Sequence, residues 1–198
     1  MNREIDARGK ACPEPVIITK KELDKIDSGS VITIVDNEIA KENVSKLANS
    51  LGHQYTVDKR DEDEYHIHII KGQGSGVIRE VSKDDIEDIT IACTSDTMGK
   101  GSEELGEILI KSLFYTMTEL TPYPSTVILY NGGVHLACEG SEVLDDLKHL
   151  EENGVEIISC GTCLDYFEIA DKLRVGEVSN MYTIYEKLKE STKLVNIG

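Results

Sequence analysis

Residues 3–16 read REIDARGKACPEPV, and this stretch sets the start of the fold. Residues 3–7 alternate in the manner of a short strand. Pro13 favours a helix that begins there, because the first helical residue needs no backbone N–H donor. Cys12 is then expected to be the N-cap, where unpaired N–H groups and the helix dipole favour the thiolate. Arg8 and Lys10 add positive charge nearby, which Glu14 partly opposes.

Cys12 therefore has two possible roles. A thiolate is the nucleophile that attacks a sulfane sulfur, so a cysteine in this position suits persulfide chemistry. The alternative is a cysteine that caps a helix and takes no part in chemistry.

Hydrophobic spacing predicts the rest of the first half. Residues 13–26 have helical spacing and stop before a Ser-Gly pair, while residues 31–35 form a β-branched run. A second helix runs to residue 51 and ends at a glycine, and residues 54–59 and 64–70 form a hairpin. The order βαβαββ predicts a two-layer α+β sandwich, with two helices on one face of a four-stranded sheet.

The second half alternates strands and helices. The glycine-rich residues 72–76 are typical of a linker, so we expect one domain at 1–71, a linker at 72–86 and a second domain at 87–198. In the second domain we expect strands at 89–93, 126–130 and 155–159, and helices at 105–120, 142–153, 166–173 and 180–189. This alternation predicts an α/β domain with a mostly parallel sheet.

Charge and hydropathy exclude some partners. The formal net charge is −16, of which −4 belongs to residues 1–70 and −12 to the rest. Such a surface repels phosphate backbones, so no nucleic-acid partner is expected. No apolar stretch approaches the roughly 18–20 residues that span a bilayer, and residues 1–6 lack the apolar part of a secretory signal. We therefore expect a cytoplasmic protein that does not bind membranes.

Five cysteines give the remaining candidates: Cys12, Cys93, Cys138, Cys160 and Cys163. Their odd number in a cytosolic chain indicates reduced thiols. Cys93 is expected to be a core residue, and Cys138 is evenly balanced between a structural and a functional role. The Cys160-Gly-Thr-Cys163 motif follows a predicted strand, where α/β domains bind ligands.

Two thiols at the spacing of Cys160 and Cys163 can form a disulfide, resolve a persulfide or hold a metal. One such motif supplies only two of the four ligands of a zinc site, and no second motif or histidine pair completes it. His66 and His68 share one face of a predicted strand, which indicates an exposed strand face. We expect neither a metal nor a cofactor.

A family resemblance supports a role for Cys12. Residues 6–16 (DARGKACPEPV), followed by Lys20-Lys21, resemble the Cys-Pro-x-Pro signature of the TusA/SirA-like sulfur-carrier family. The predicted order of elements in residues 1–71 is also that of the family. The resemblance implies that Cys12 accepts sulfur as a persulfide from a donor protein and passes it to an acceptor protein.

The second half is similar to the DsrE/DsrF-like domains. The similarity rests on residues 96–101 (DTMGKG), 131–135 (NGGVH) and 155–165 (VEIISCGTCLD). It implies that Cys160 accepts the sulfur, that Cys163 resolves it, and that copies of the chain assemble into a homo-oligomer. The fusion of both domains resembles the sulfurtransferase-like YedF-type proteins of selenium metabolism, and selenium enters only through this resemblance.

Three hypotheses follow. In the first, Cys12 takes sulfur or selenium from a donor and presents it to Cys160, backed by Cys163, or to a partner. In the second, the chain is a binding or scaffold protein without transfer chemistry. In the third, it is a dithiol oxidoreductase that uses Cys160 and Cys163.

Overall fold

The computed structural model describes residues 2–61, 63–72 and 86–198. The chain divides into two compact units, Met1–Glu80 and Val81–Gly198, and each is described by itself. Residues 73–85 of the expected linker lie outside the described residues.

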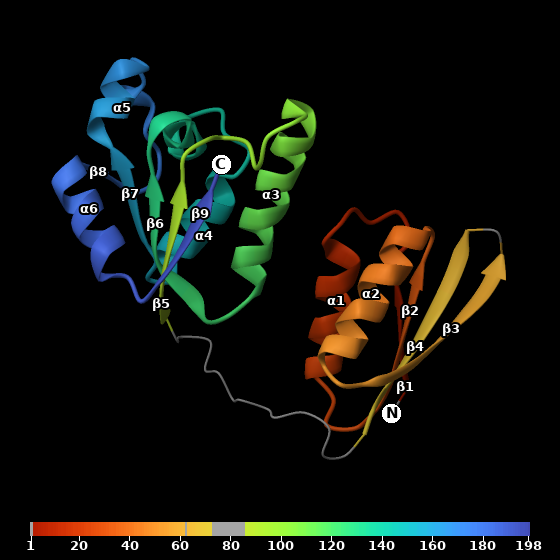
Figure 1. Cartoon of the computed structure of the whole chain (residues 1–198). Helices are drawn as coiled ribbons and strands as arrows, with labels where there is room; N and C mark the ends of the chain where they lie inside the picture. The colour runs from red at the N-terminus through yellow and green to blue at the C-terminus, as the bar shows by residue number, and fades with distance from the viewer. Residues whose placement is uncertain (1, 62, 73–85) are drawn as a thin grey trace. The chain divides into compact units, whose positions relative to one another are not determined.

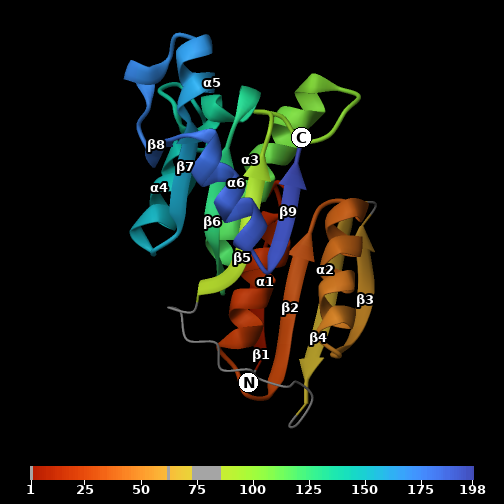
Figure 2. The ribbon, with the colours of Figure 1, turned by 60° about the vertical axis from the view of Figure 1, so that its left-hand side comes forward.

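The first unit is a two-layer sandwich. Its elements are β1 (Asn2–Asp6), α1 (Glu14–Asp24), β2 (Gly29–Val35), α2 (Glu38–Ser50), β3 (Gln54–Asp61) and β4 (Glu64–Lys71). The sheet order is β1-β2-β4-β3, with β1 parallel to β2 and the other pairs antiparallel. Both helices pack on one face of this sheet (Figures 1 and 2). The structure confirms the predicted α+β sandwich.

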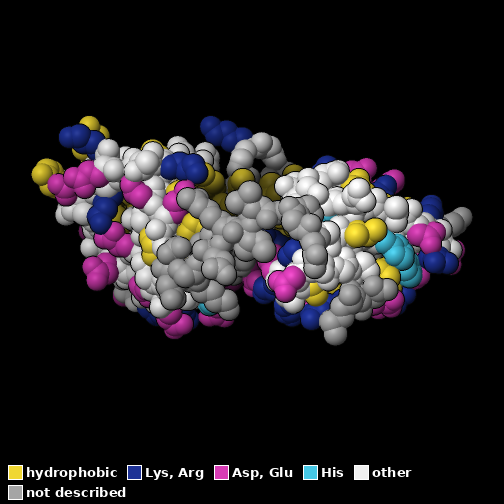
Figure 3. Space-filling model, turned by 90° about the horizontal axis from the view of Figure 1, so that it is seen from below, with side chains coloured by type: hydrophobic (Ala, Val, Ile, Leu, Met, Phe, Trp, Pro, Cys, Tyr) yellow, Lys and Arg dark blue, Asp and Glu magenta, His cyan; other side chains and the backbone are white. Residues whose placement is uncertain are grey.

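Alternation along β4 separates the two faces of this sheet. Ile67 and Ile69 are fully buried beneath the helices, whereas His66 and His68, which alternate with them, are half-buried on the opposite side. Figure 3 shows histidine side chains at the surface of this unit beside hydrophobic ones. His66 and His68 share one face of β4, as predicted, but they are half-buried and not exposed.

The second unit is an α/β domain. Its elements are β5 (Ile86–Cys93), α3 (Glu103–Glu119), β6 (Tyr123–Leu129), η1 (Asn131–Ala137), α4 (Leu144–Glu152), β7 (Glu156–Cys160), α5 (Gly161–Tyr166), η2 (Ala170–Lys172), β8 (Glu177–Ser179), α6 (Met181–Glu190) and β9 (Lys193–Ile197). The five strands follow the order β8-β7-β6-β5-β9, and every neighbouring pair is parallel. This confirms the predicted α/β class.

The central strand of this sheet, β6, has the continuous burial that is typical of α/β domains. Residues 127–129 of β6 are consecutively buried with no exposed surface, because helices cover both faces of the sheet. Phe114 of α3 and Leu147 of α4 are fully buried in the same core.

Four elements differ from the sequence prediction. The helix expected at 166–173 is absent: α5 begins earlier, at Gly161, and only the short η2 follows. The strands β8 and β9 and the 3-10 helix η1 were not predicted. β8 has only three residues, and in β9 only Ile197 is buried, so neither strand leaves a clear alternating pattern.

Candidate functional site

Cys12 lies in the loop between β1 and α1, and its side chain is exposed. The prediction that Cys12 is the N-cap is wrong by one residue. The N-cap is Pro13, whose φ of −97° and ψ of 10° are not helical, and α1 begins at Glu14. The Cys12–Pro13 peptide bond is cis. Cys12 therefore precedes the N-cap of α1.

The loop that carries Cys12 is fastened at several points. The N–H of Gly9, which has a φ of +73°, donates to Asp36 Oδ2 at 2.6 Å. The Arg8 guanidinium binds both carboxylate oxygens of Asp6 and also Glu64, at 2.7–2.9 Å. The hydrogen bond from Arg8 lowers the pKa of Asp6 to about 2. These bonds tie the loop to the residue after β2 and to the start of β4.

The local positive charge that the sequence suggests for Cys12 is neutralised. Arg8 is shared by two carboxylates, and the Lys10 ammonium forms an ion pair with Glu14 one helical turn later. Each of these two cations is therefore balanced by at least one carboxylate, which weakens its attraction for a Cys12 thiolate.

Helix α2 supplies the other wall of the Cys12 site. The Asn43 amide nitrogen lies 3.9 Å from Cys12 Sγ, in the geometry of a weak hydrogen bond. A cavity of about 40 Å³ opens beside the thiol, between Pro15 and Val16 of α1 and Ile39 of α2. Ile39 is 71% exposed. The thiol thus sits at an open, partly apolar notch between the first turns of two helices.

Cys160 and Cys163 lie side by side at the end of β7. Cys160 is the last residue of that strand and is 1% exposed, whereas Cys163, in α5, is half-buried. The backbone N–H of Asn131 donates to Cys163 Sγ at 3.1 Å. Burial raises the pKa of the Cys163 thiol; the Asn131 N–H opposes this, and a hydrogen bond with Cys160 adds to it.

The burial of these two thiols bears on their roles. The family resemblance assigns the accepting role to Cys160 and the resolving role to Cys163. An incoming group from outside the unit reaches the half-buried Cys163 more readily than Cys160.

Cys93 and Cys138 are core residues of the second unit. Cys93 is fully buried at the end of β5, and burial raises its pKa to about 12. Cys138 is 3% exposed, and its thiol donates to the Val134 carbonyl oxygen at 3.2 Å. Burial raises the pKa of Cys138 as well.

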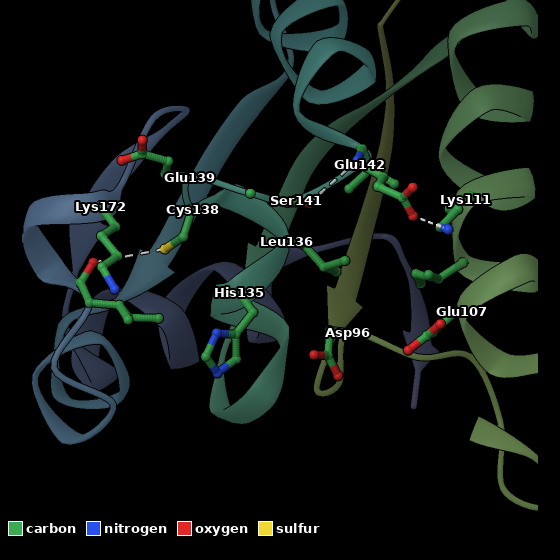
Figure 4. A pocket seen from close by; sticks show the side chains of 14 residues that line it. Asp96, Glu107, Lys111, His135, Leu136, Cys138, Glu139, Ser141, Glu142 and Lys172 are labelled. Carbon is green, nitrogen blue, oxygen red and sulfur yellow. Dashed lines mark hydrogen bonds and ion pairs between the residues drawn. The ribbon is translucent and has the colours of Figure 1, made fainter. Parts of the chain in front are cut away.

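A cavity of about 550 Å³ lies at the carboxyl ends of the parallel strands (Figure 4). Asp96 follows β5, His135 lies in η1, and Cys138 follows η1; all three line the cavity. Lys111 of α3 and Glu142 form an ion pair at its border. Sequence reasoning did not find this cavity, because its walls come from segments far apart in the chain.

Within residues 2–61, 63–72 and 86–198, no three His, Cys, Asp or Glu side chains are grouped to hold a metal ion. In the same part of the chain, no helix is long and apolar enough to cross a membrane.

Comparisons with known proteins match the two units separately. The family model described as "Sulfurtransferase TusA" matches residues 3–71, and that of the "DsrE/DsrF-like family" matches residues 90–197. A "Putative sulfur carrier protein" of Methanocaldococcus jannaschii is 35% identical over 69 residues, which are 34% of this chain and 89% of that protein.

Two solved structures are similar to single units. A SirA-like protein from Desulfitobacterium hafniense is 36% identical with a TM-score of 0.34, over 35% of this chain and 97% of its own. A protein of unknown function from Methanobacterium thermoautotrophicum is 22% identical with a TM-score of 0.42, over 57% of this chain and 99% of its own.

Proposed function

Because the chain belongs to the TusA sulfurtransferase family through its first unit and to the DsrE/DsrF-like family through its second, we propose that it carries sulfur as a persulfide on Cys12. The observation that carries the proposal is the exposure of the Cys12 thiol at the notch between α1 and α2. A thiol in this position is open to attack a partner and has room beside it for one more atom.

The loading step is a thiol exchange. The Cys12 thiolate attacks the outer, sulfane sulfur of a donor cysteine persulfide. A bond forms between that sulfur and Cys12 Sγ, and the S–S bond of the donor breaks. The donor leaves as a thiolate, and Cys12 holds the persulfide. A perselenide forms in the same way if the donor supplies selenium.

Cys163 and Cys160 complete the relay in this proposal. The Cys163 thiolate attacks the outer sulfur on Cys12 and takes it as a persulfide, which frees the Cys12 thiolate. Cys160 then attacks Cys163 Sγ, which releases hydrogen sulfide and leaves a Cys160–Cys163 disulfide. A cellular dithiol reductant restores both thiols. The contact between these two thiols supports this step.

Intact-mass spectrometry after exposure to a persulfide donor tests the loading step. We expect the wild type to gain the mass of one sulfur atom only transiently, before it loses two hydrogen atoms in the Cys160–Cys163 disulfide, and Cys12→Ser to gain none on its first unit. Cys163→Ser should retain its load on Cys12 and form no disulfide with Cys160. A Cys12→Ser variant that loads like the wild type contradicts the proposal.

The contact of Cys160 with Cys163 also favours a second candidate, the dithiol oxidoreductase. That function requires a reversible Cys160–Cys163 disulfide that forms and is reduced at the same rate in the Cys12→Ser variant. A scaffold protein without chemistry requires neither mass gain nor disulfide. The same mass spectra therefore separate the three hypotheses.

The proposal implies a donor protein and an acceptor protein as partners. We also place the chain in the cytoplasm, because the reducing conditions there preserve free thiols. Repeating the experiment with a perselenide donor tests selenium loading, because selenium adds a larger mass than sulfur.

We further propose that copies of the chain associate through α3. Leu105, Ile108 and Leu109 lie at i, i+3 and i+4 on this helix and are 52%, 54% and 41% exposed. Such a stripe is stabilised when a second apolar surface covers it. We expect sedimentation velocity to show an oligomer for the wild type and a smaller species for Ile108→Asp. Equal sedimentation of both would contradict this interface.

A further inference from the structure

A groove of about 490 Å³ lies in the first unit between α2 and β3. β3 is an outer strand of the sheet, and α2 covers it only in part (Figure 1). The pair Val57 and Ile67 shows this directly. They face each other across β3 and β4 on the helix side, yet Ile67 is fully buried and Val57 is 41% exposed.

The groove is basic, although the whole chain carries a net charge of −16. Lys41 and Lys46 of α2 and Lys59 of β3 line it, with one carboxylate, Glu42. The ammonium groups of Lys41 and Lys59 each lie 5.4 Å from the centre of the Tyr65 ring. The ring attracts both positive charges and so stabilises the two lysines in these positions. Lys41 also pairs with Glu38, at 3.0 Å.

A buried hydroxyl in the same groove points to a ligand. Ser45 of α2 lines the groove and is 9% exposed. Among the described residues, its Oγ has no hydrogen-bond partner. A buried hydroxyl without a partner destabilises a folded protein, and a rotation of the Ser45 side chain that brings its Oγ to the groove surface would let a ligand supply the missing bond.

We propose that this groove binds an extended acidic peptide segment of a partner protein, which adds as a strand to the open edge of β3. Main-chain hydrogen bonds to an edge strand bind any extended peptide, and the side chains facing the groove select among them. In an extended peptide, alternate side chains point to one side. Acidic residues on that side meet the three lysines that line the groove.

The groove is separate from the Cys12 site. Ile39 and Asn43 of α2 line the Cys12 notch, whereas Lys41 and Ser45 of the same helix line the groove. A peptide in the groove therefore leaves Cys12 open to react, so the site is suited to hold a partner during transfer.

Fluorescence anisotropy on the full chain tests the proposal. The probe is a labelled peptide as long as β3 (8 residues) that alternates Glu and Val, and the comparison peptide alternates Lys and Val. We expect the acidic peptide to bind at least about tenfold more tightly and to weaken as salt is raised. Equal binding of both peptides would overturn the proposal.

Charge-reversal variants locate the binding site. Lys46→Glu/Lys59→Glu should weaken acidic-peptide binding by about tenfold. The matched control, Lys21→Glu/Lys25→Glu, changes the net charge by the same amount at exposed positions near the end of α1, and it should change peptide affinity by less than about twofold. Circular dichroism checks that both variants fold. A control that loses as much affinity as the groove variant refutes the assignment.

Two further variants separate the groove from its surroundings. Ser45→Ala should weaken peptide binding by about threefold. It should not lower the melting temperature of the free protein, because the substitution removes an unpaired buried hydroxyl. Cys12→Ser should bind the peptide like the wild type. This result does not depend on whether Cys12 carries sulfur. If Cys12→Ser no longer binds the peptide, the peptide site lies at Cys12 and not in the groove.

Discussion

At the scale of single residues, the five thiols differ most in their access to water. Cys12 is exposed and Cys163 is half-buried, whereas Cys93, Cys138 and Cys160 are buried. A thiolate needs solvent or a positive neighbour, so burial in apolar surroundings holds a thiol in its neutral form. Cys12 is therefore the thiol that a partner protein reaches most readily.

Alkylation with iodoacetamide should follow this order. We expect Cys12 to react first at about pH 7, because it is exposed. Cys163 should react appreciably only at a more alkaline pH, since a raised pKa means that its thiolate forms at a higher pH than usual. Cys93, with a pKa of about 12, should stay unmodified in the folded protein. Peptide mapping measures each site.

The control for this experiment is the unfolded chain. In concentrated guanidinium, all five cysteines should react at similar rates, because the differences come from the fold. Modification of Cys163 at equal rates at both pH values in the folded protein would contradict the burial argument.

The sequence predicted that Cys12 lies at the start of α1 but not what surrounds it. Helix-start rules placed the thiol within one residue of its observed place relative to α1. They could not foresee that Arg8 binds Glu64, because that contact joins positions 56 residues apart. The Asn43 contact with Cys12 likewise depends on how α2 packs beside α1.

At the scale of elements, η1 links two of the thiol positions. Its first residue, Asn131, bonds to Cys163, and two residues later Gly133 packs on the end of β5. A Cβ on Gly133 would lie 2.2 Å from the Cys93 carbonyl oxygen, so only glycine allows this approach. The position of the Asn131 N–H therefore depends on Gly133.

Gly133→Ala should destabilise the chain by about 1–3 kcal/mol, because η1 must move away from β5. The same shift should change the alkylation rate of Cys163. Thermal unfolding and peptide mapping measure the two effects.

Gly132→Ala is the matched control, since a Cβ there meets its nearest atom at an ordinary 3.6 Å. It should change stability by less than about 0.5 kcal/mol. Equal effects of the two substitutions would show that the close contact with Cys93 is unimportant.

Sequence patterns predicted the long elements and missed the short ones. Helices such as α3 repeat hydrophobic residues over several turns, so their signal is strong. η1 is a short 3-10 helix held by contacts with β5 and α5, and no local pattern specifies it. The start of α5 was missed for a related reason, because the CxxC motif reads as a loop in isolation.

At the scale of the whole molecule, each unit has its own core. The buried hydrophobic side chains form two clusters, one for each unit. A domain with its own core can fold alone. We propose that the division near residues 72–86 separates two independent folding units.

Fragments 1–72 and 86–198 test this independence. Each should unfold cooperatively, at the temperature at which the same unit unfolds in the full chain. Differential scanning calorimetry of both fragments and of the full chain measures this. A fragment that lacks a cooperative transition would show that its core needs the other unit.

The place of β9 in the sheet has a consequence for protein synthesis. β9 lies beside β5, the first strand of its unit, and Thr94 N–H bonds to the Ile197 carbonyl oxygen across 103 positions. The ribosome therefore synthesises β5 long before it synthesises β9. Until residue 197 has emerged, the nascent sheet keeps one bare edge, which chaperones or other nascent chains can bind.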